Sequence, residues 1–283
     1  PPTVLILGET GTGKDVVARL LHSKSNLNDR PFVHVDCASL PKDLIESELF
    51  GHEKGAFTNA NVARAGLIEA AENGVLFLDE IAEIPIDLQS KLLAVLERRS
   101  LRRIGSTKEL PVAAWIIAAT NRDIEVLVKN REFRSDLYYR LNVMTIKMPS
   151  LRDRDNDIVL LSNYFANLTS KRYGLSFDGF TKQALKQIEE YSWHGNVREL
   201  KHLIERAVLL NGGGTLDSKV LSLDKNDGIN DEAEIINDVT LGEAELRLIK
   251  IALERTNRNV SKAARELGIT RMALRYRIKK YNL

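Results

Sequence analysis

The segment GETGTGKD at residues 8–15 combines closely spaced glycines with a lysine and a carboxylate. It directly follows the apolar run TVLIL, and the next residues, DVVARLLHSK, have the spacing of an amphipathic helix. Glycines let the backbone curl so that its N–H groups point inward, and the helix N-terminus adds partial positive charge. This context predicts a phosphate-binding loop in which Lys14 reaches the β- and γ-phosphates of a nucleotide. A glycine-rich turn without a ligand is the alternative.

Carboxylates suited to phosphate chemistry follow at two places. Asp15 stands directly after Lys14, where most such loops have a serine or threonine for Mg²⁺, and a carboxylate can hold the same ion. Asp79 and Glu80 emerge from the apolar run VLFL, the first suited to coordinate Mg²⁺ and the second to position and deprotonate a water. Capping of a following helix is the alternative for this pair. With the loop upstream, nucleotide hydrolysis is the favoured interpretation.

Two further groups could act on the same phosphate. AATN at 118–121 ends a predicted central strand with Thr120 and Asn121, whose polar groups could sense a γ-phosphate. Arg134 and Arg140 lie in FRSDLYYRL at 133–141. They are either ordinary ion-pair partners or groups that complete a neighbouring subunit's site, because arginine neutralises charge on a transferred phosphoryl group.

The elements that must position these residues are predicted from apolar patterning. Buried strands are expected at 3–8, 31–36, 75–80 and 113–120, with helical stretches between them. Such alternation predicts an α/β fold with a parallel sheet and helices on both faces. Helical periodicity alone follows, at about 157–171, 181–191 and 196–210, and NGGGT at 211–215 is a break. We predict an α/β subdomain over 1–148, an α-helical subdomain over 149–211, a linker over 212–239 and a helical domain over 240–283.

The C-terminal segment NVSKAARELGITRMALRYRIKKY at 259–281 has the pattern of a helix-turn-helix. Gly268 makes the turn, and Thr270 can cap the second helix. Helical spacing predicts an inward face on each helix, formed by Val260, Ala263, Ala264 and Leu267 on the first and by Leu274, Ile278 and Tyr281 on the second. Residues 261–283 hold seven basic residues and one acid, in a chain whose net charge is only +2. A helix with this basic face suits the major groove of double-stranded DNA, and a generic three-helix bundle is the alternative. The predicted DNA-binding residues are Arg271, Met272, Arg275, Lys279 and Lys280.

Composition argues against a membrane-spanning, disulfide-bonded or metal-stabilised protein. The 283-residue chain has ample apolar material for a core, and no run approaches the roughly 18 apolar residues of a membrane span. We therefore expect no membrane partner. Cys37 is the only cysteine, which excludes an internal disulfide and fits a reducing cytoplasm. The histidines make no metal-ligand spacing with it, so no structural metal is assigned.

The order of these motifs resembles that of an AAA+ ATPase. It runs from the phosphate-binding loop through the Asp79–Glu80 pair, AATN and the two arginines to WHGNVREL at 193–200. A further motif, GAFTNA, lies between the first two. It narrows the resemblance to the central domain of sigma-54-dependent transcription activators, also called bacterial enhancer-binding proteins. The C-terminal segment resembles the Fis-type domain at the end of these activators. GAFTNA comprises Gly55, Ala56, Phe57, Thr58, Asn59 and Ala60.

The resemblance implies a homo-oligomeric ring, a hexamer or heptamer, that hydrolyses ATP with Mg²⁺ at its interfaces. It also implies a dimeric DNA-binding domain on enhancer DNA, contact of Phe57 with sigma-54 RNA polymerase supported by Thr58, and a place in two-component regulation. Arg140 is the first choice for the trans-acting arginine finger, with Arg134 beside it, and Arg198 matches the lid's sensor II arginine. Asp79–Glu80 match Walker B, and Thr120 and Asn121 match sensor I. The Walker A and adjoining nucleotide residues are Gly8, Glu9, Thr10, Gly11, Thr12, Gly13, Lys14, Asp15 and Val16.

Three positions depart from the family pattern. Asn59 replaces a glycine, which keeps the turn while stiffening it. Asp36 stands where the family has an asparagine that restrains the Walker B glutamate, so we expect it to repel Glu80. His194 replaces a proline. The alternative function is a sigma-54-independent DNA-binding regulator in which ATP only controls assembly. A DNA helicase or replication-initiator ATPase is a less favoured interpretation, because neither requires a GAFT-type loop.

Overall fold

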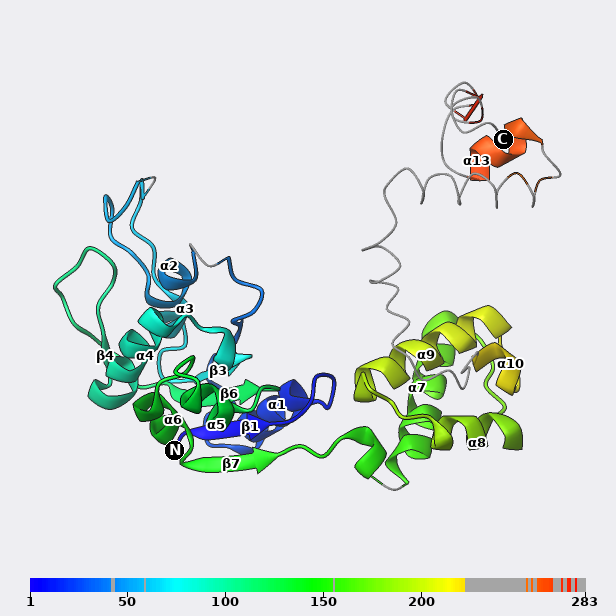
Figure 1. Cartoon of the computed structure of the whole chain (residues 1–283), viewed down its shortest axis with the longest axis horizontal. Helices are drawn as coiled ribbons and strands as arrows, with labels where there is room; N and C mark the ends of the chain where they lie inside the picture. The colour runs from blue at the N-terminus through cyan, green and yellow to red at the C-terminus, as the bar shows by residue number, and fades with distance from the viewer. Residues whose placement is uncertain are drawn as a thin grey trace. The chain divides into compact units, whose positions relative to one another are not determined.

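The computed structural model describes residues 1–41, 44–58, 60–154 and 156–221, together with residues 253, 256, 259–266, 271, 274, 275 and 278. The chain forms two compact units, Pro1–Leu223 and Asp224–Leu283 (Figure 1). Within the described part, no helix combines the length and apolar character needed to cross a membrane.

The first unit contains a five-stranded parallel sheet with the strand order β2-β3-β6-β1-β7. The predicted parallel α/β sheet is therefore confirmed, and all four predicted strands form. The edge strand β7 was missed because its residues are mostly exposed. The expectation that 31–36 is a buried strand was wrong, since β2 is also an edge strand and only its Val35 is buried. The strands are β1 Val4–Leu7, β2 Phe32–Asp36, β3 Val75–Asp79, β6 Trp115–Thr120 and β7 Met144–Lys147.

Both faces of this sheet are buried, which explains why its central strands are apolar throughout. Alternate residues of each strand enter different cores. Phe77 and Ile117 pack with Ala18 of helix α1, whereas Leu76 and Ile116 pack with the larger set of helices on the opposite face. The helices of this part are α1 Lys14–Lys24, α2 Ile45–Phe50, α3 Leu67–Ala70, α4 Ile86–Arg98, α5 Ile124–Lys129 and α6 Ser135–Leu141, with the 3₁₀ turn η1 Ile81–Glu83.

A small antiparallel pair lies outside the main sheet. Strands β4 Ser100–Leu101 and β5 Leu110–Pro111 follow α4 and are joined by a loop that extends from the molecule (Figure 1). Sequence patterning did not predict this pair, because two-residue strands leave no period to detect.

The helical subdomain encloses a separate core. Trp193 lies at its centre, fully buried, and its Nε1–H donates to the carbonyl of Ile188 at 2.8 Å. The three helices predicted here are present with ends shifted by up to two residues, and α9 ends next to Gly212 in the left-handed conformation. The elements are η2 Leu151–Asp153, α7 Asp157–Tyr173, α8 Lys182–Glu190, α9 Asn196–Asn211 and α10 Ser218–Leu221.

The second unit is described only in part. Helix α13, Val260–Glu266, begins after Asn259, whose Oδ1 accepts hydrogen bonds from the N–H groups of Ser261 and Lys262. Ala263, Ala264 and Leu274 are buried together, as the helix-turn-helix pattern predicts, with Leu253, Val260 and Ile278 packed against them. Arg271 and Arg275 are exposed. Several predicted positions lie outside the described residues: Leu267, Gly268, Thr270, Met272, Lys279, Lys280, Tyr281 and residues 222–239 of the predicted linker.

Candidate nucleotide site and projecting loop

The predicted phosphate-binding loop connects the end of β1 to the start of α1 at the carboxyl edge of the sheet. Lys14 is only 6% exposed, and its Nζ donates to the carbonyls of Gly8 at 3.0 Å and Glu9 at 3.4 Å. Gly13 has φ 95° and opens α1, and a Cβ there would meet no atom within 4 Å. The loop therefore bends around Lys14 and leaves open space in front of the helix N-terminus, as a phosphate cradle requires.

The predicted carboxylates meet this loop at the end of β3. Glu80 Oε1 lies 3.5 Å from Lys14 Nζ, and Oε2 accepts a hydrogen bond from the backbone N–H of Asn121 at 3.1 Å. The Glu80 backbone is left-handed, with φ 49°, which is strained for a non-glycine residue. This strained turn directs the carboxylate toward Lys14 and the end of β6.

Asp79 is partly buried beside Glu80. Burial raises the pKa of Asp79 above its ordinary value, and the negative charge of Glu80 raises it further. Asp79 Oδ1 accepts from the Glu80 N–H at 3.1 Å, and Oδ2 lies 3.6 Å from Nε2 of His34 on β2. Asp15 is exposed in the first turn of α1. Among the described residues, no cluster of three or more His, Cys, Asp or Glu side chains could hold a metal ion.

The end of β6 contributes the predicted polar pair. Thr120 is buried, and its Oγ1 accepts from the Arg122 N–H at 3.1 Å. Asn121 is exposed, and its Nδ2 donates to Oγ1 of Thr10 at 2.8 Å. Asn121 thus contacts the phosphate-binding loop through its side chain and Glu80 through its backbone.

The helical subdomain also contacts the loop, through Glu9. Arg152 donates two hydrogen bonds to the Glu9 carboxylate, at 3.0 and 2.5 Å, and Nδ2 of Asn196 donates a third at 3.0 Å. These hydrogen bonds lower the pKa of Glu9 to about 2, and those from Arg152 contribute most. The backbone N–H of Arg198 donates to the carbonyl of Gly11 at 3.3 Å, and the Arg198 side chain is exposed.

Asp36 does not occupy the role that an asparagine would have. It is exposed at the end of β2, and its Oδ1 accepts from the Ala38 N–H at 3.0 Å. The Glu80 carboxylate is instead held by Lys14 and by the Asn121 N–H. A restraint on Glu80 is therefore present without the family asparagine.

The two predicted arginines lie at opposite ends of α6. Arg134 forms a two-pronged ion pair with Asp136, at 3.0 and 2.7 Å, which raises the pKa of Arg134. Arg140 donates through Nη2 to the carbonyl of Leu96 at 3.1 Å. Both are exposed, and in the described part of the chain neither forms a hydrogen bond or ion pair with the phosphate-binding loop.

The segment between α2 and α3 extends from the molecule beside the β4–β5 loop (Figure 1). At its base, His52 and Arg64 exchange two backbone hydrogen bonds of 2.9 Å. Ile104 of the neighbouring loop forms a β-bridge with His52. Near its tip, Ala60 N–H donates to the Phe57 carbonyl at 3.0 Å. The Phe57 side chain is 41% exposed. Asn59 lies outside the described residues.

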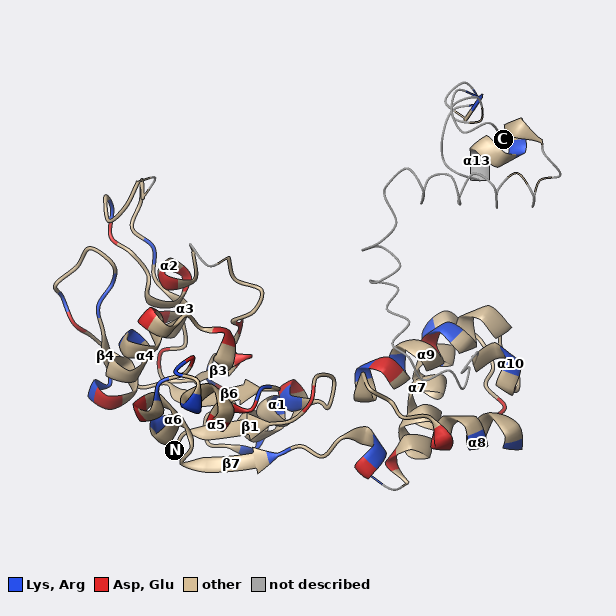
Figure 2. Ribbon diagram, in the orientation of Figure 1, with Lys and Arg blue, Asp and Glu red and all other residues tan. Residues whose placement is uncertain are grey.

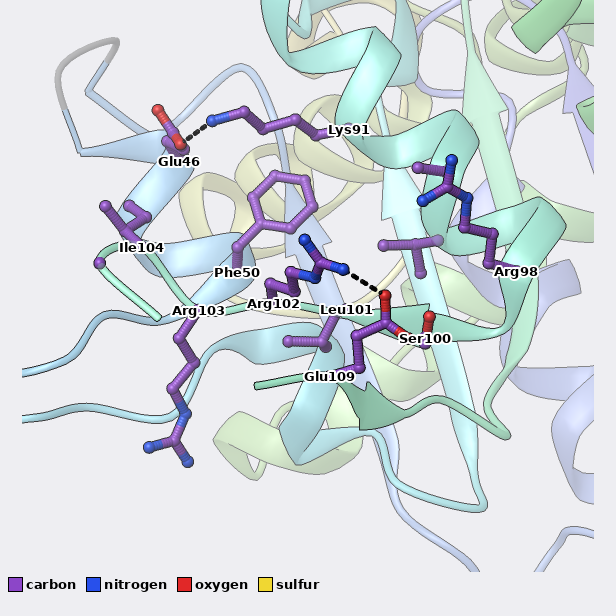
Figure 3. A pocket seen from close by; sticks show the side chains of 13 residues that line it. Glu46, Phe50, Lys91, Arg98, Ser100, Leu101, Arg102, Arg103, Ile104 and Glu109 are labelled. Carbon is purple, nitrogen blue, oxygen red and sulfur yellow. Dashed lines mark hydrogen bonds and ion pairs between the residues drawn. The ribbon is translucent and has the colours of Figure 1, made fainter. Parts of the chain in front are cut away.

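A pocket of about 360 Å³ lies under the bases of these two projecting loops (Figure 3). Phe50 lies within it, the Lys91–Glu46 and Arg102–Glu109 ion pairs line its rim, and the Arg103 side chain extends away. The two loops themselves carry both signs of charge (Figure 2). None of the predicted nucleotide residues lines this pocket.

Comparison with known proteins identifies the family. The Sigma-54 interaction domain matches residues 1–147, the AAA+ ATPase lid domain residues 152–234, and the Fis family of bacterial regulatory proteins residues 240–281. The chain belongs to the sigma-54 interaction domain family. The predicted resemblance and the AAA+ core with a helical lid and a Fis-type domain are thereby confirmed.

Relatives of this sigma-54 interaction domain chain include three curated proteins. The chain is 45% identical to the formate hydrogenlyase transcriptional activator FhlA of Escherichia coli K12 and 43% identical to the regulatory protein AtoC of the same strain, over 99% of its length in both. It is 46% identical to the transcriptional regulatory protein ZraR of Salmonella typhi over 96% of its length. The chain spans 41%, 63% and 62% of these three proteins.

A solved structure also resembles this family member. The crystal structure of NtrX from Brucella abortus in complex with ATP has a TM-score of 0.74 and 30% sequence identity, covering all of this chain and 64% of the NtrX chain. The same protein in complex with ADP also has a TM-score of 0.74.

Most residues predicted for the sigma-54 interaction domain's nucleotide site come together, but some partners were missed. Lys14, Asp79, Glu80 and Asn121 converge on one edge of the sheet, as predicted, and Arg198 approaches from the lid. Arg152, Asn196 and His34 were not predicted as partners in this site. Asn196 lies within WHGNVREL, but no local pattern indicates the contacts of these three residues, since each is distant in sequence from its partner and only the fold brings them together.

Proposed function

We propose that this chain hydrolyses ATP and uses the energy to activate transcription by sigma-54 RNA polymerase from enhancer-bound sites. The observation that carries this proposal is that one family-matched domain, residues 1–147, combines the Lys14–Glu80 site with a projecting loop that presents Phe57. A phosphate site by itself would support any AAA+ ATPase.

The glycine-rich loop fits the phosphates of a nucleoside triphosphate. A side chain at Gly8 would lie 2.7 Å from Met148 Cβ, so the close approach of Met148 requires glycine there, and Gly13 leaves room for a phosphate. Lys14, now bonded to loop carbonyls, would exchange them for phosphate oxygens. Asp15 and Asp79 would hold Mg²⁺, which needs only one or two protein carboxylates beside phosphate oxygens. The ion would neutralise charge on the phosphates.

Glu80 is the proposed base that positions and deprotonates the attacking water. Its ion pair with Lys14 and the hydrogen bond that it accepts from the Asn121 N–H hold the carboxylate away from other partners until Lys14 binds phosphate. Asn121 and Thr120 would sense the γ-phosphate. Arg198 would contact the nucleotide from the lid, where the backbone of its helix already contacts Gly11.

The remaining charge would come from a neighbouring copy in a ring, a hexamer or heptamer. Arg140 is the better candidate for the finger, because a single carbonyl occupies it, whereas Asp136 engages two nitrogens of Arg134. An exposed guanidinium with donors to spare can reach a phosphate across an interface.

The C-terminal domain would bind double-stranded DNA as a dimer. Arg271 and Arg275 are exposed four residues apart, as expected of a DNA-facing helix. Met272, Lys279 and Lys280 are proposed with them. We also propose the domain limits 1–148, 149–211, 212–239 and 240–283 for the α/β part, lid, linker and DNA-binding domain.

The test of this proposal compares Lys14→Ala with Lys24→Ala, a matched change at the other end of α1. Lys14→Ala should abolish ATP turnover and leave DNA binding intact, and Lys24→Ala should retain both. Mixing Lys14→Ala with Arg140→Ala protein should restore turnover, because each supplies what the other lacks across an interface. Turnover by Lys14→Ala alone would disprove the site, and an inactive mixture would disprove the trans role of Arg140.

Promoter opening by sigma-54 polymerase then tests the biological role. Opening that depends on ATP and on intact Lys14 is the expected result. Hydrolysis without opening would support the regulator in which ATP only controls assembly.

A further inference from the structure

The imidazole of His52 lies beneath Phe57, at the base of the projecting loop. The two ring centroids are 5.0 Å apart, with an interplanar angle of 67°, so the contact is edge-to-face. His52 is 8% exposed, whereas Phe57 is 41% exposed. One part of the phenyl ring therefore rests on a buried surface while the rest faces solvent.

His52 is itself held from three directions. Its Nδ1 shares a hydrogen bond of 2.7 Å with Oγ of Ser47, a buried residue of α2. Its backbone pairs with Arg64 through two hydrogen bonds of 2.9 Å and bridges to Ile104. A ring so constrained gives Phe57 a contact surface with one orientation.

The neighbouring hairpin loop supports this arrangement. The Ile104 N–H donates to the Gly51 carbonyl at 2.9 Å, and the Glu53 N–H donates to the Ile104 carbonyl at 3.0 Å. Arg103 then bridges Glu53 to Glu69 of α3, at 3.2 and 2.7 Å. The base of the loop carrying Phe57 is thus held on both sides, while its tip is held through the turn from Phe57 to Ala60 and through the His52 ring.

We propose that His52 is a positioning residue that holds the Phe57 side chain in the orientation in which it contacts sigma-54. The inference rests on the proposed function, because it assumes that Phe57 makes that contact. An aromatic side chain that is already oriented loses less rotamer freedom on binding. Without the His52 ring, Phe57 must be ordered by the partner instead, and affinity falls.

The first test measures binding of isolated sigma-54 to the full chain in the presence of a non-hydrolysable ATP analogue. His52→Ala should weaken binding by about 2- to 13-fold, the range expected when one more side chain must be immobilised on binding. His52→Phe keeps a ring in contact with Phe57 and should restore affinity. His202→Ala, an exposed histidine on α9, is the matched control and should leave binding unchanged. ATP turnover should persist in all three variants, which shows that each one folds.

Unchanged or tighter binding by His52→Ala would overturn the proposal, and so would failure of His52→Phe to restore binding. A second measurement does not depend on sigma-54. A ¹⁹F label on the Phe57 ring should show a shift in the wild-type chain that is absent from the urea-unfolded chain, and that moves toward the unfolded value in His52→Ala. No such difference would overturn the contact itself. Failure of wild-type chain to bind sigma-54, with the ¹⁹F shift present, would count against the proposed function and leave the contact standing.

Discussion

At Gly11 the backbone of the phosphate-binding loop lies directly against the backbone of the lid, so Gly11→Ala is a sharp test of their coupling. A Cβ at residue 11 would lie 2.3 Å from the carbonyl oxygen of Gly195 and 3.1 Å from Arg198 Cβ. The oxygen must retreat by roughly 0.7 Å to reach the 3.0 Å that real contacts keep. Gly195 cannot do so freely, because its N–H is bonded to Glu199 at 2.8 Å.

Two costs follow from this change. Gly11 has φ 80°, and an alanine there costs roughly 1–2 kcal/mol of backbone strain. The displaced lid would also misalign the groups that contact the nucleotide. A shift near 1 Å can lower the rate of hydrolysis about 100-fold, which corresponds to an activation free energy about 2.7 kcal/mol higher. We therefore expect a modest loss of stability and a large loss of ATP turnover.

Gly174→Ala is the matched control for Gly11→Ala. Gly174 closes α7 with φ 66°, and a Cβ there would meet nothing within 4 Å. It should lose the same stability in urea unfolding yet retain turnover. Equal ATP turnover in the two variants would refute the reasoning, because the contact with Gly195 would then have no consequence at the site.

Three further predictions concern other residues. Glu9 has a folded-state pKa of about 2, below its ordinary 4.5, so its bonds to Arg152 stabilise the fold above pH 4.5 and are lost as pH falls toward 2. Because both side chains of the pair are more than a third exposed, we expect it to add at most about 1 kcal/mol to the free energy of unfolding. Urea unfolding should show this as a difference between wild type and Glu9→Gln that vanishes in acid. A difference that stays constant with pH would contradict the prediction. Arg131→Gly should raise the free energy of unfolding by about 0.5–1 kcal/mol, seen as a higher melting temperature, because φ 62° strains an arginine by more than the added entropy of glycine costs. A similar gain in Arg131→Ala would argue against strain as the cause. Cys37 is buried, and burial raises its pKa to about 12, so iodoacetamide should react with it only in urea; rapid reaction of the folded chain would show that the thiol is accessible.

The sequence alone was sufficient for the residues whose chemistry is local. Lys14 follows a glycine-rich turn, and Asp79 and Glu80 end an apolar strand, so each pattern carries its own physical reason. Parallel strands place their carboxyl ends at one edge, and this made the meeting of Lys14 with Glu80 predictable. The buried positions Ala263, Ala264 and Leu274 likewise followed from helical spacing.

Other features depended on contacts between distant segments. Three such features have no periodic signature in the sequence. They are the edge position of β2, the hydrogen bond from Asn196 to Glu9 across 187 residues, and the contact of His52 with Phe57. Glu80 illustrates the same limit, because its two positive partners, the Lys14 ammonium and the Asn121 N–H, come from segments far from it in the sequence. Sequence determined which chemical groups this protein carries and in which kind of element. Only the tertiary structure decided which groups touch, because such pairings are set by the packing of whole elements and not by any spacing along the chain.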